Sequence, residues 1–381
     1  MVGVEQLELV GWQSDIALPR SYAPYAPEAF TVERIVLCKG SLDSPEREAF
    51  VRGICAVYPC VPVEERLDTP HNRVEIAEPD PLRRLERGKR TLVMGAARVE
   101  NVVRVNRNPN AIFPYRQSFS VYGFCPYGCA YCYLTGSPGV WFSPTVKIYV
   151  NLPEILAEVD RRAREEGQEI VFCLGKFEDG LALDPLTEYS TVLVPFFANH
   201  PYARLLLQTK SASVERLLDL NHGGNTVLSW TLNPAPIAER YEPGAPRVDD
   251  RMAAMRRCAE HGYPVRANIT PVIPDANWEE LYLDFICELA KCVPLRQLTI
   301  GGIRIDPRGR SLLEQRMGKE NAVLQALDPN TADENSCAFY KPGLLRRLFA
   351  GIYDTVPHIR PCSTRYDTHH SRAHLVLDFE Q

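Results

Sequence analysis

Residues 124–133 read Phe-Cys-Pro-Tyr-Gly-Cys-Ala-Tyr-Cys-Tyr and place Cys125, Cys129 and Cys132 in one loop with the spacing Cys-x3-Cys-x2-Cys. Soft thiolate sulfur suits iron–sulfur clusters, and electron-transfer clusters of the four-iron type use four cysteines. Three thiolates leave one iron open to another ligand, much as an open coordination position marks a catalytic zinc. The stretch therefore predicts a 4Fe-4S cluster at which chemistry takes place.

A structural zinc site is the alternative interpretation of the same loop. Such a site needs a closed tetrahedral shell of four ligands. No nearby histidine or cysteine completes that shell, since the next cysteine downstream is Cys173. A zinc-containing, non-catalytic binding module remains the hypothesis from another functional class, and iron analysis would decide between the two.

The cysteine loop, with an aromatic residue directly before its third cysteine, resembles that of radical S-adenosylmethionine (SAM) enzymes. Within that superfamily the chain resembles the spore photoproduct lyase family, which repairs a thymine–thymine adduct in DNA without light. The resemblance is an ordered series of short motifs between about residues 34 and 310, at 71–74, 89–95, 131–134, 149–154, 208–210 and 242–244.

This resemblance implies two cofactors, a 4Fe-4S cluster and SAM. In the superfamily, the methionine end of SAM chelates the open iron, and one electron from the cluster cleaves the sulfonium to a 5'-deoxyadenosyl radical. An electron donor such as flavodoxin or ferredoxin is therefore expected. The expected substrate is a thymine lesion in DNA or a related nucleotide. A nucleoside or other small metabolite in a biosynthetic pathway is the alternative.

From Ser118 onward, the pattern predicts strands alternating with helices. Strands are expected at 117–123, 146–150, 169–174, 204–209, 226–231, 264–270 and 296–300, and helices near 153–166, 186–198, 213–219, 249–261 and 278–290. Near-continuous apolar strands such as 169–174 are typical of a parallel sheet covered by helices. If 146–150 is an extra strand in the long first loop, six repeating units remain. That number agrees with the α/β fold implied by the resemblance, a partial (β/α)6 TIM-type barrel, with its site at the C-terminal strand ends.

Three parts are expected along the chain. Residues 1–90 would form a small N-terminal α/β unit, including a helix at 45–57, and a connector from residue 66. Residues 91–310 would form the barrel, with the cluster loop at 125–132. Residues 311–381 would form a divergent C-terminal extension over the barrel mouth, with a loop at 318–342. Asn151 is expected to cap the helix that follows it.

Charge and apolar content limit the functional classes. The net charge of −5 excludes a large basic field over the whole surface, so any DNA contact must be local. The clearest basic runs lie at 83–90 and 346–347. Without a secretory signal or an apolar run long enough to span a bilayer, a cytoplasmic location is expected, and its reducing conditions suit an oxygen-sensitive cluster.

The resemblance also implies where SAM is held. Six residues at or near strand ends are expected to contact it: Tyr133, Glu178, Asp179, Lys210, Thr231 and Asn233. Tyr133 matches the family's adenine contact, and Lys210 matches the lysine for the methionine carboxylate. Thr231 replaces a family serine and keeps a hydroxyl. Asn233 either binds the cofactor or caps the next segment.

Four further residues are expected near the reacting substrate: Tyr131, Cys173, Lys176 and Arg304. In the family, a cysteine after the second barrel strand returns hydrogen to the product radical, and an ungapped match puts Lys176 at that position. An ammonium has no weak bond to hydrogen, so Cys173 becomes a candidate donor if its side chain points into the barrel rather than toward the helices. Tyr131 is expected to relay or quench a radical or to pack beside the cluster. Arg304 is expected to face the active-site end.

Overall fold

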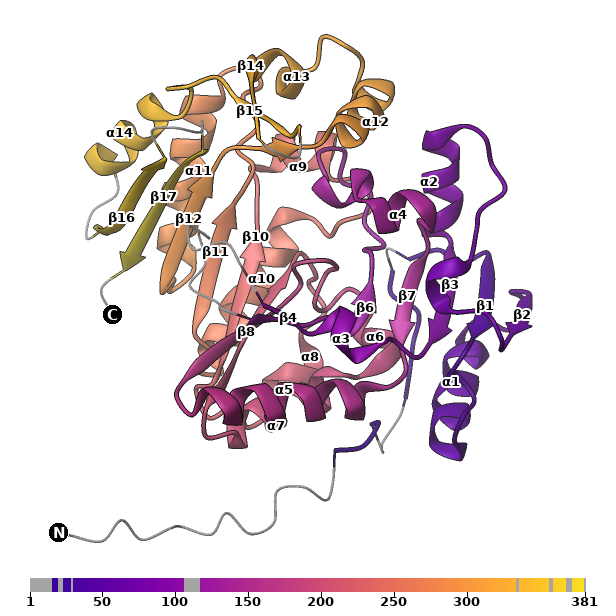
Figure 1. The fold of residues 1–381 in the computed structure, drawn as a ribbon. Helices are drawn as coiled ribbons and strands as arrows, with labels where there is room; N and C mark the ends of the chain where they lie inside the picture. The colour runs from indigo at the N-terminus through magenta and orange to yellow at the C-terminus, as the bar shows by residue number, and fades with distance from the viewer. Residues whose placement is uncertain are drawn as a thin grey trace, which may run out of the picture.

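The computed structural model describes residues 16–19, 23–28, 30–105, 117–333, 336–355, 359–367 and 372–379. Its N-terminal part forms a five-stranded sheet with the order β2-β1-β3-β7-β6 (Figure 1). The strands are β1 (Arg34–Cys38), β2 (Val63–Arg66), β3 (Thr91–Gly95), β6 (Tyr122–Gly123) and β7 (Val146–Tyr149). Only β6 is antiparallel to its neighbour.

Helix α1 (Pro45–Val57) covers one face of this sheet. It begins where the Ser44 hydroxyl accepts a hydrogen bond of 3.3 Å from the Arg47 amide, with Pro45 in the first turn. Its buried Phe50 packs in the same core cluster as Ile35 of β1. The sheet also takes in β3 and β7, so strand pairing carries it beyond residue 90, the boundary expected from the sequence.

A nine-stranded sheet forms the barrel, with the order β16-β17-β12-β11-β10-β9-β8-β5-β4. Its six parallel strands are β5 (Gln117–Ser118), β8 (Ile170–Leu174), β9 (Ala203–Thr209), β10 (Thr226–Thr231), β11 (Val265–Ile269) and β12 (Gln297–Gly301). Strands β4 (Arg104–Val105), β16 (Ile359–Asp367) and β17 (Arg372–Phe379) add antiparallel edges. The six parallel strands in an open sheet confirm the predicted partial barrel.

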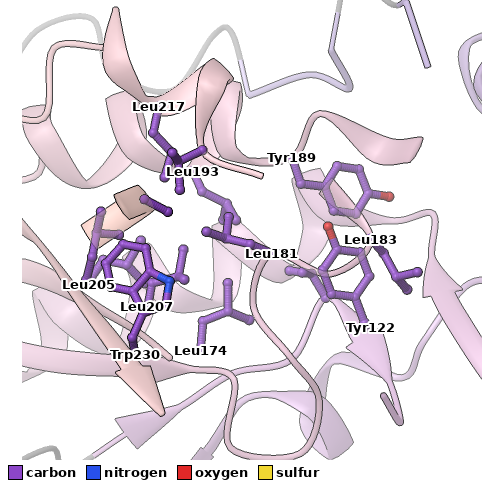
Figure 2. Packing of buried hydrophobic residues seen from close by; sticks show 14 of the residues in the cluster. Tyr122, Leu174, Leu181, Leu183, Tyr189, Leu193, Leu205, Leu207, Leu217 and Trp230 are labelled. Atoms are coloured by element: carbon purple, nitrogen blue, oxygen red, sulfur yellow. The ribbon is translucent and has the colours of Figure 1, made fainter. Parts of the chain in front are cut away.

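Helices pack on the outer face of the barrel (Figure 1). They are α5 (Leu152–Glu166), α6 (Asp184–Thr187), α7 (Ser190–Asn199), α8 (Glu215–Leu218), α10 (Val248–Glu260) and α11 (Trp278–Cys292). Helix α9 (Ala235–Tyr241) instead packs against the cysteine loop, since its Ile237 and Tyr241 share a cluster with Tyr131. Figure 2 shows Leu205, Leu207 and Trp230 of neighbouring strands packed beside Leu193 and Leu217 of the covering helices. In the described part of the chain, no helix combines the length and apolar character needed to cross a membrane.

The inner face of the barrel is apolar at its base and becomes polar toward the C-terminal strand ends. Cys173 and Leu206 lie opposite each other in register and pack together, apart from the main core. Because side chains alternate along a strand, Gln208, Ser229 and Thr231 lie on this same inner face, further along their strands. The polar end is the one at which the sequence predicts the site.

Three local expectations from the sequence were wrong. The 66–90 connector contains η1 (His71–Arg73) and helix α2 (Pro81–Lys89), which the Asp80 side chain caps. The expected loop at 318–342 contains α13 (Ala322–Ala326), β14 (Leu327–Ala332) and β15 (Ala338–Tyr340). Asn151 does not cap α5, because its side-chain amide bonds both backbone groups of Ala97.

The remaining elements form two groups. Beside the cysteine loop lie η2 (Tyr133–Gly136), α4 (Pro138–Phe142), β13 (Arg304–Ile305) and α12 (Pro307–Met317), whereas α3 (Val99–Val102) packs on α5 and α14 (Arg346–Thr355) packs on α11. Strands β13, β15 and β14 form a third sheet, and its Ile305 packs in the same cluster as Tyr131 of the cysteine loop.

Candidate metal centre and cofactor site

The three cysteines lie in the loop between β6 and η2. Cys129 is buried, whereas Cys125 and Cys132 are half-buried. Burial is the main cause that raises the pKa of the Cys125 thiol, and the charge of Asp179 is the next. Lys89 lowers this pKa, whereas Cys129 and Cys132 raise it further. The three sulfurs therefore share one electrostatic environment.

This donor set suits an iron–sulfur cluster. Within the described ranges, no three or more His, Cys, Asp or Glu side chains are arranged around a single metal-ion position. A cube-shaped cluster instead binds each thiolate through a separate iron atom. Burial also raises the pKa of Cys129, to about 11. A raised pKa makes the thiolate harder to form, and metal coordination would offset this effect, because a bound metal deprotonates its thiol ligands.

Lys89, at the end of α2, supports the first half of the loop. Its buried ammonium donates to the carbonyl oxygens of Cys125, at 3.0 Å, and Tyr127. It also lies 4.4 Å from the ring centroid of Phe124. These contacts fix the loop backbone and bring a positive charge to a site that would hold a negatively charged cluster.

The second half of the loop is docked on the end of α9. The Gly128 amide donates to the Pro243 carbonyl at 2.7 Å, and the Ala130 amide donates to the Tyr241 carbonyl at 2.8 Å. A Cβ atom at residue 128 would lie only 2.8 Å from the Pro243 oxygen, so this close approach requires glycine.

A buried carboxylate, Glu242, joins the loop to the barrel. Its Oε1 accepts hydrogen bonds from the Tyr131 hydroxyl and, at 2.9 Å, from the Asn233 amide. Its Oε2 pairs with the Arg251 guanidinium at 2.6 Å, and both side chains are at most 1% exposed. Burial raises the pKa of Glu242, but the charges of Lys210 and Arg251 outweigh it, so the pKa is lowered.

Asn233, expected at the cofactor, is wholly buried in this network. Its amide nitrogen donates to Glu242 and Tyr131, while its oxygen accepts a 2.6 Å hydrogen bond from Tyr282. Through these hydrogen bonds, the Asn233 side chain supports the cysteine loop. The cap expected at Asn233 is not formed, because helix α9 has no side-chain cap.

Lys210 lies where β9 ends and faces the cysteine loop. Its ammonium is 5.7 Å from the centroid of the Tyr131 ring. Burial lowers the pKa of Lys210, but the negative charges of Glu242 and Cys129 outweigh it, so the pKa is raised and the lysine stays cationic. A cation beside the cysteine loop suits an anionic group such as the carboxylate of SAM.

Asp179 holds the loop after β8 to the end of β9. Its Oδ1 accepts from the Thr209 hydroxyl at 2.6 Å and from the amides of Leu181 and Ala182. Its Oδ2 accepts from the Lys210 amide at 2.6 Å. The carboxylate thus positions Lys210 through the backbone.

Glu178 is the one carboxyl expected at the cofactor that has an unused buried oxygen. Oε2 accepts from the Ser120 hydroxyl at 3.0 Å, whereas Oε1 has no hydrogen-bond partner among the described residues. Burial raises the pKa of Glu178 to about 8. The side chain is therefore largely protonated at neutral pH and has hydrogen-bonding capacity to spare.

Tyr133 and Thr231 are the remaining residues expected at the cofactor. Tyr133 is 46% exposed, and its hydroxyl donates to the Lys176 carbonyl, which ties the cysteine loop to the loop after β8. Thr231 is half-buried at the end of β10, and its carbonyl accepts from Arg251 at 3.3 Å.

Cys173 points into the barrel, which decides the alternative left open by the sequence. It is wholly buried on the inner face of β8. Lys176 is half-buried at the rim; burial lowers its pKa and the nearby Cys173 opposes that effect. Cys173 is therefore the more deeply buried of the two side chains.

Arg304 lies in β13, beyond the last parallel strand of the barrel. Its side chain is 44% exposed, and both Nε and Nη2 lie 2.9 Å from Oδ2 of Asp333. The structure thus joins Arg304 to the C-terminal extension rather than to the cysteine loop.

Three supporting residues escaped the sequence analysis: Lys89, Glu242 and Arg251. The first two lie within motifs at 89–95 and 242–244 that carry the resemblance, but no role followed from those motifs. Arg251 has no such signal, because only the fold brings α10 to Glu242.

The chain is similar to known proteins over most of its length. Residues 47–302 match the family model described as spore photoproduct lyase. The spore photoproduct lyase of a Geobacillus species is 30% identical over 264 residues, which cover 68% of this chain and 75% of that protein. The Bacillus subtilis protein of the same name is 28% identical over 234 residues, covering 61% and 66% respectively.

Solved structures give the same fold. A spore photoproduct lyase variant with bound AdoMet and dinucleoside spore photoproduct has a TM-score of 0.74 and 24% identity, covering 87% of this chain and 98% of that chain. Spore photoproduct lyase complexed with dinucleoside spore photoproduct has a TM-score of 0.74 and 23% identity, with the same coverage.

Proposed function

The chain belongs to the spore photoproduct lyase family of radical SAM enzymes, and from this premise we propose that it acts on a thymine lesion in DNA. The observation that carries the proposal is the cysteine loop, which Glu242 and Lys89 hold against the C-terminal strand ends. Cys125, Cys129 and Cys132 would hold the cluster. When bound, the cluster and SAM together supply a 5'-deoxyadenosyl radical.

The remaining residues would bind and orient. Lys210 neutralises the methionine carboxylate, and Tyr133, which matches the family's adenine contact, packs against the adenine. Glu178 offers a buried carboxyl, and Thr231 a hydroxyl on the inner face. Such positioning supplies much of a catalytic rate gain, because it removes the entropy cost of bringing reactants together.

The product radical would regain hydrogen from within the barrel. Cys173 lies three residues before Lys176, which occupies the position where the family has its donor cysteine. The Cys173 thiol would give up its hydrogen atom, either directly or through Tyr131, and would itself become the radical. Loss of label return in Cys173→Ala, with hydrogen abstraction retained, supports this role; unchanged label return contradicts it.

The proposal also includes an electron donor and a cellular compartment. The cluster needs a one-electron donor of the flavodoxin or ferredoxin type. The eleven cysteines whose side chains the structure describes are free thiols, which supports a reducing, cytoplasmic compartment.

Anaerobic reconstitution tests the proposal. The protein should bind iron and sulfide, and dithionite with SAM should release 5'-deoxyadenosine. Cys129→Ala should abolish both, whereas Cys292→Ala, at an exposed cysteine on α11, should leave both intact. With a lesion-bearing dinucleoside deuterated at the reacting carbon, label should enter 5'-deoxyadenosine. A pure protein that holds zinc and no iron would sink the proposal.

A nucleoside or other small metabolite is the second candidate substrate. The lysine at position 176 favours this candidate. It replaces the family's donor cysteine, and we expect a changed route of hydrogen return to accompany a changed substrate. Steeply salt-dependent binding to lesion-containing oligonucleotides favours DNA, since phosphate contacts release counterions. Binding of a free nucleoside, with none to oligonucleotides, favours the metabolite.

A further inference from the structure

Helices α2, α4 and α12 lie close together (Figure 1), and arginines of α2 and α12 gather around a tryptophan of α4. We define this arginine surface by Arg83, Arg84, Trp141, Arg308 and Arg310. Trp141 lies at its centre, with the guanidinium carbons of Arg84 and Arg308 at 4.9 and 5.1 Å from its ring centroid. Arg83, Arg308 and Arg310 are exposed, and Arg84 is half-buried.

Two carboxylates border this surface, because Asp80 and Asp306 accept hydrogen bonds from the Arg83 and Arg308 amides, but among the described residues neither pairs with a guanidinium group. Other arginines of the region are paired: Arg87 lies 3.6 Å from Glu78, and Arg90 lies 2.7 Å from Glu33. In the part of the chain that the structure describes, the four arginines of the arginine surface form no ion pair. On a protein with a net charge of −5, this surface is a local exception. It therefore suits a partner of negative charge.

The arginine surface is continuous with the proposed cluster ligands. Trp141 packs at the edge of a hydrophobic cluster that contains Cys132, Leu85 of α2 and Leu312 of α12. Helix α2 also reaches the loop directly through Lys89. At a rise of about 1.5 Å per residue, the five residues from Arg84 to Lys89 span only about 7.5 Å of helix.

Helix α12 makes a second direct contact. The Arg316 guanidinium donates to the Gly128 carbonyl at 2.9 Å. Two of the three helices that carry the arginine surface therefore touch the cysteine loop, and a protein bound there would lie against elements that contact the loop.

We propose that the arginine surface docks a small acidic electron-transfer protein that reduces the cluster. This inference rests on the proposed function, because it needs a cluster to reduce. One electron passes from the reduced flavin or iron–sulfur centre of the partner to the cluster. The partner is oxidised by one electron, the cluster is reduced by one, and no bond forms or breaks.

The position and size of the surface favour this partner over a nucleic acid. Electron transfer needs close approach to the cysteine loop, which the contacts of α2 and α12 provide. Redox encounters use small, weak interfaces steered by charge, and four arginines around one tryptophan match that size. Nucleic-acid binding draws on a longer stripe of phosphate contacts.

Binding of purified flavodoxin to the reconstituted protein tests the proposal. The double variant Arg84→Glu/Arg308→Glu should weaken binding at low salt by about tenfold or more, and the difference should shrink as salt rises and screens the charges. Arg83→Gln/Arg310→Gln, which leaves the stacking on Trp141 intact, should weaken binding less. Arg256→Glu, an exposed arginine on α10, is the matched control and should bind as the parent does.

The choice of reductant separates this inference from the proposed function. The double variant should release 5'-deoxyadenosine normally with dithionite but slowly with reduced flavodoxin. Failure of the parent with dithionite would count against the proposed function itself. Unchanged flavodoxin affinity in both arginine pairs overturns the docking surface. So does weakened oligonucleotide binding with normal flavodoxin affinity, which would assign the surface to nucleic acid.

Discussion

Glu242 accepts hydrogen bonds from the cysteine loop and from β10's following loop, and it pairs with Arg251 of α10. The Glu242–Arg251 ion pair stabilises the folded state by less than the attraction between its charges, because desolvating the two charges offsets much of that attraction. Removing the Glu242 charge alone would strongly destabilise the protein, since the buried Arg251 charge would then have no partner of opposite charge.

Glu242→Gln should therefore destabilise the protein by about 3–5 kcal/mol and lower its iron content after reconstitution. Urea unfolding and iron analysis measure the two effects. Glu242→Gln/Arg251→Met removes both charges and should recover part of the loss. If the single variant unfolds at the parent's urea concentration, the network does not hold the loop.

Glu178 gives a prediction about pH. Its pKa is raised from 4.5 to about 8 in the folded protein, so the folded state binds more protons than the unfolded state between these values. Stability from this group is full below pH 4.5 and is lost as pH rises toward 8, at about 1.4 kcal/mol per pH unit at most.

Glu178→Gln should flatten this dependence and raise the free energy of unfolding at pH 8 relative to the parent. Urea unfolding between pH 5.5 and about 8.5 measures it. Glu260→Gln, at an exposed carboxyl on α10, should leave the slope unchanged. Parallel pH profiles for the parent and Glu178→Gln would contradict the raised pKa.

At the scale of elements, the docking of the cysteine loop on α9 depends on a missing side chain. Gly128→Ala would place Cβ 2.8 Å from the Pro243 carbonyl oxygen, and this contact is with backbone, which yields little. The loop should shift away from α9, and iron retention after desalting should fall severalfold. Gly139→Ala is the matched control, since nothing lies within 4 Å of its added Cβ. Alanine in helix α4 should be neutral or stabilise by up to about 1 kcal/mol. Equal iron retention in both variants would contradict the docking.

Helices and strands were predictable where one pattern dominated. The inner strands have long apolar runs, and α1 and α5 show clear starts at Pro45 and Pro153. Helix α2 was missed because prolines 79 and 81 suggested a connector, yet Pro81 sits in the first turn, where its missing amide hydrogen costs nothing. The strands at 327–332 and 338–340 were missed because they are short and pair only with each other and β13.

The cysteines and Lys210 were predictable because each closes a recognisable strand or loop. The network around Glu242 was not, since Tyr131, Asn233, Glu242 and Arg251 come from separate segments and meet only after folding. The same holds for Lys89, which reaches the carbonyls of a loop 36 residues further along the chain.

At the scale of the whole molecule, one continuous core joins the N-terminal sheet to the barrel. Leu92 of β3 and Leu205 of β9 belong to the same buried cluster. Strands β6 and β7 pair within the N-terminal sheet, although the cysteine loop lies between them in the sequence. The N-terminal sheet and the cluster should therefore be lost in a single cooperative transition.

Leu92→Ala tests this coupling, because it removes a wholly buried side chain of β3, remote in sequence from the cysteines. The loss should be about 2–5 kcal/mol, as for buried leucines in general. In anaerobic urea titrations of the reconstituted protein, cluster absorbance and far-UV circular dichroism should share one midpoint, and the variant should lower both equally. Leu67→Ala, at a leucine that is 42% exposed, should leave both unchanged. An early phase in circular dichroism alone, with the cluster absorbance midpoint unmoved, would show that the N-terminal sheet unfolds independently of the metal centre.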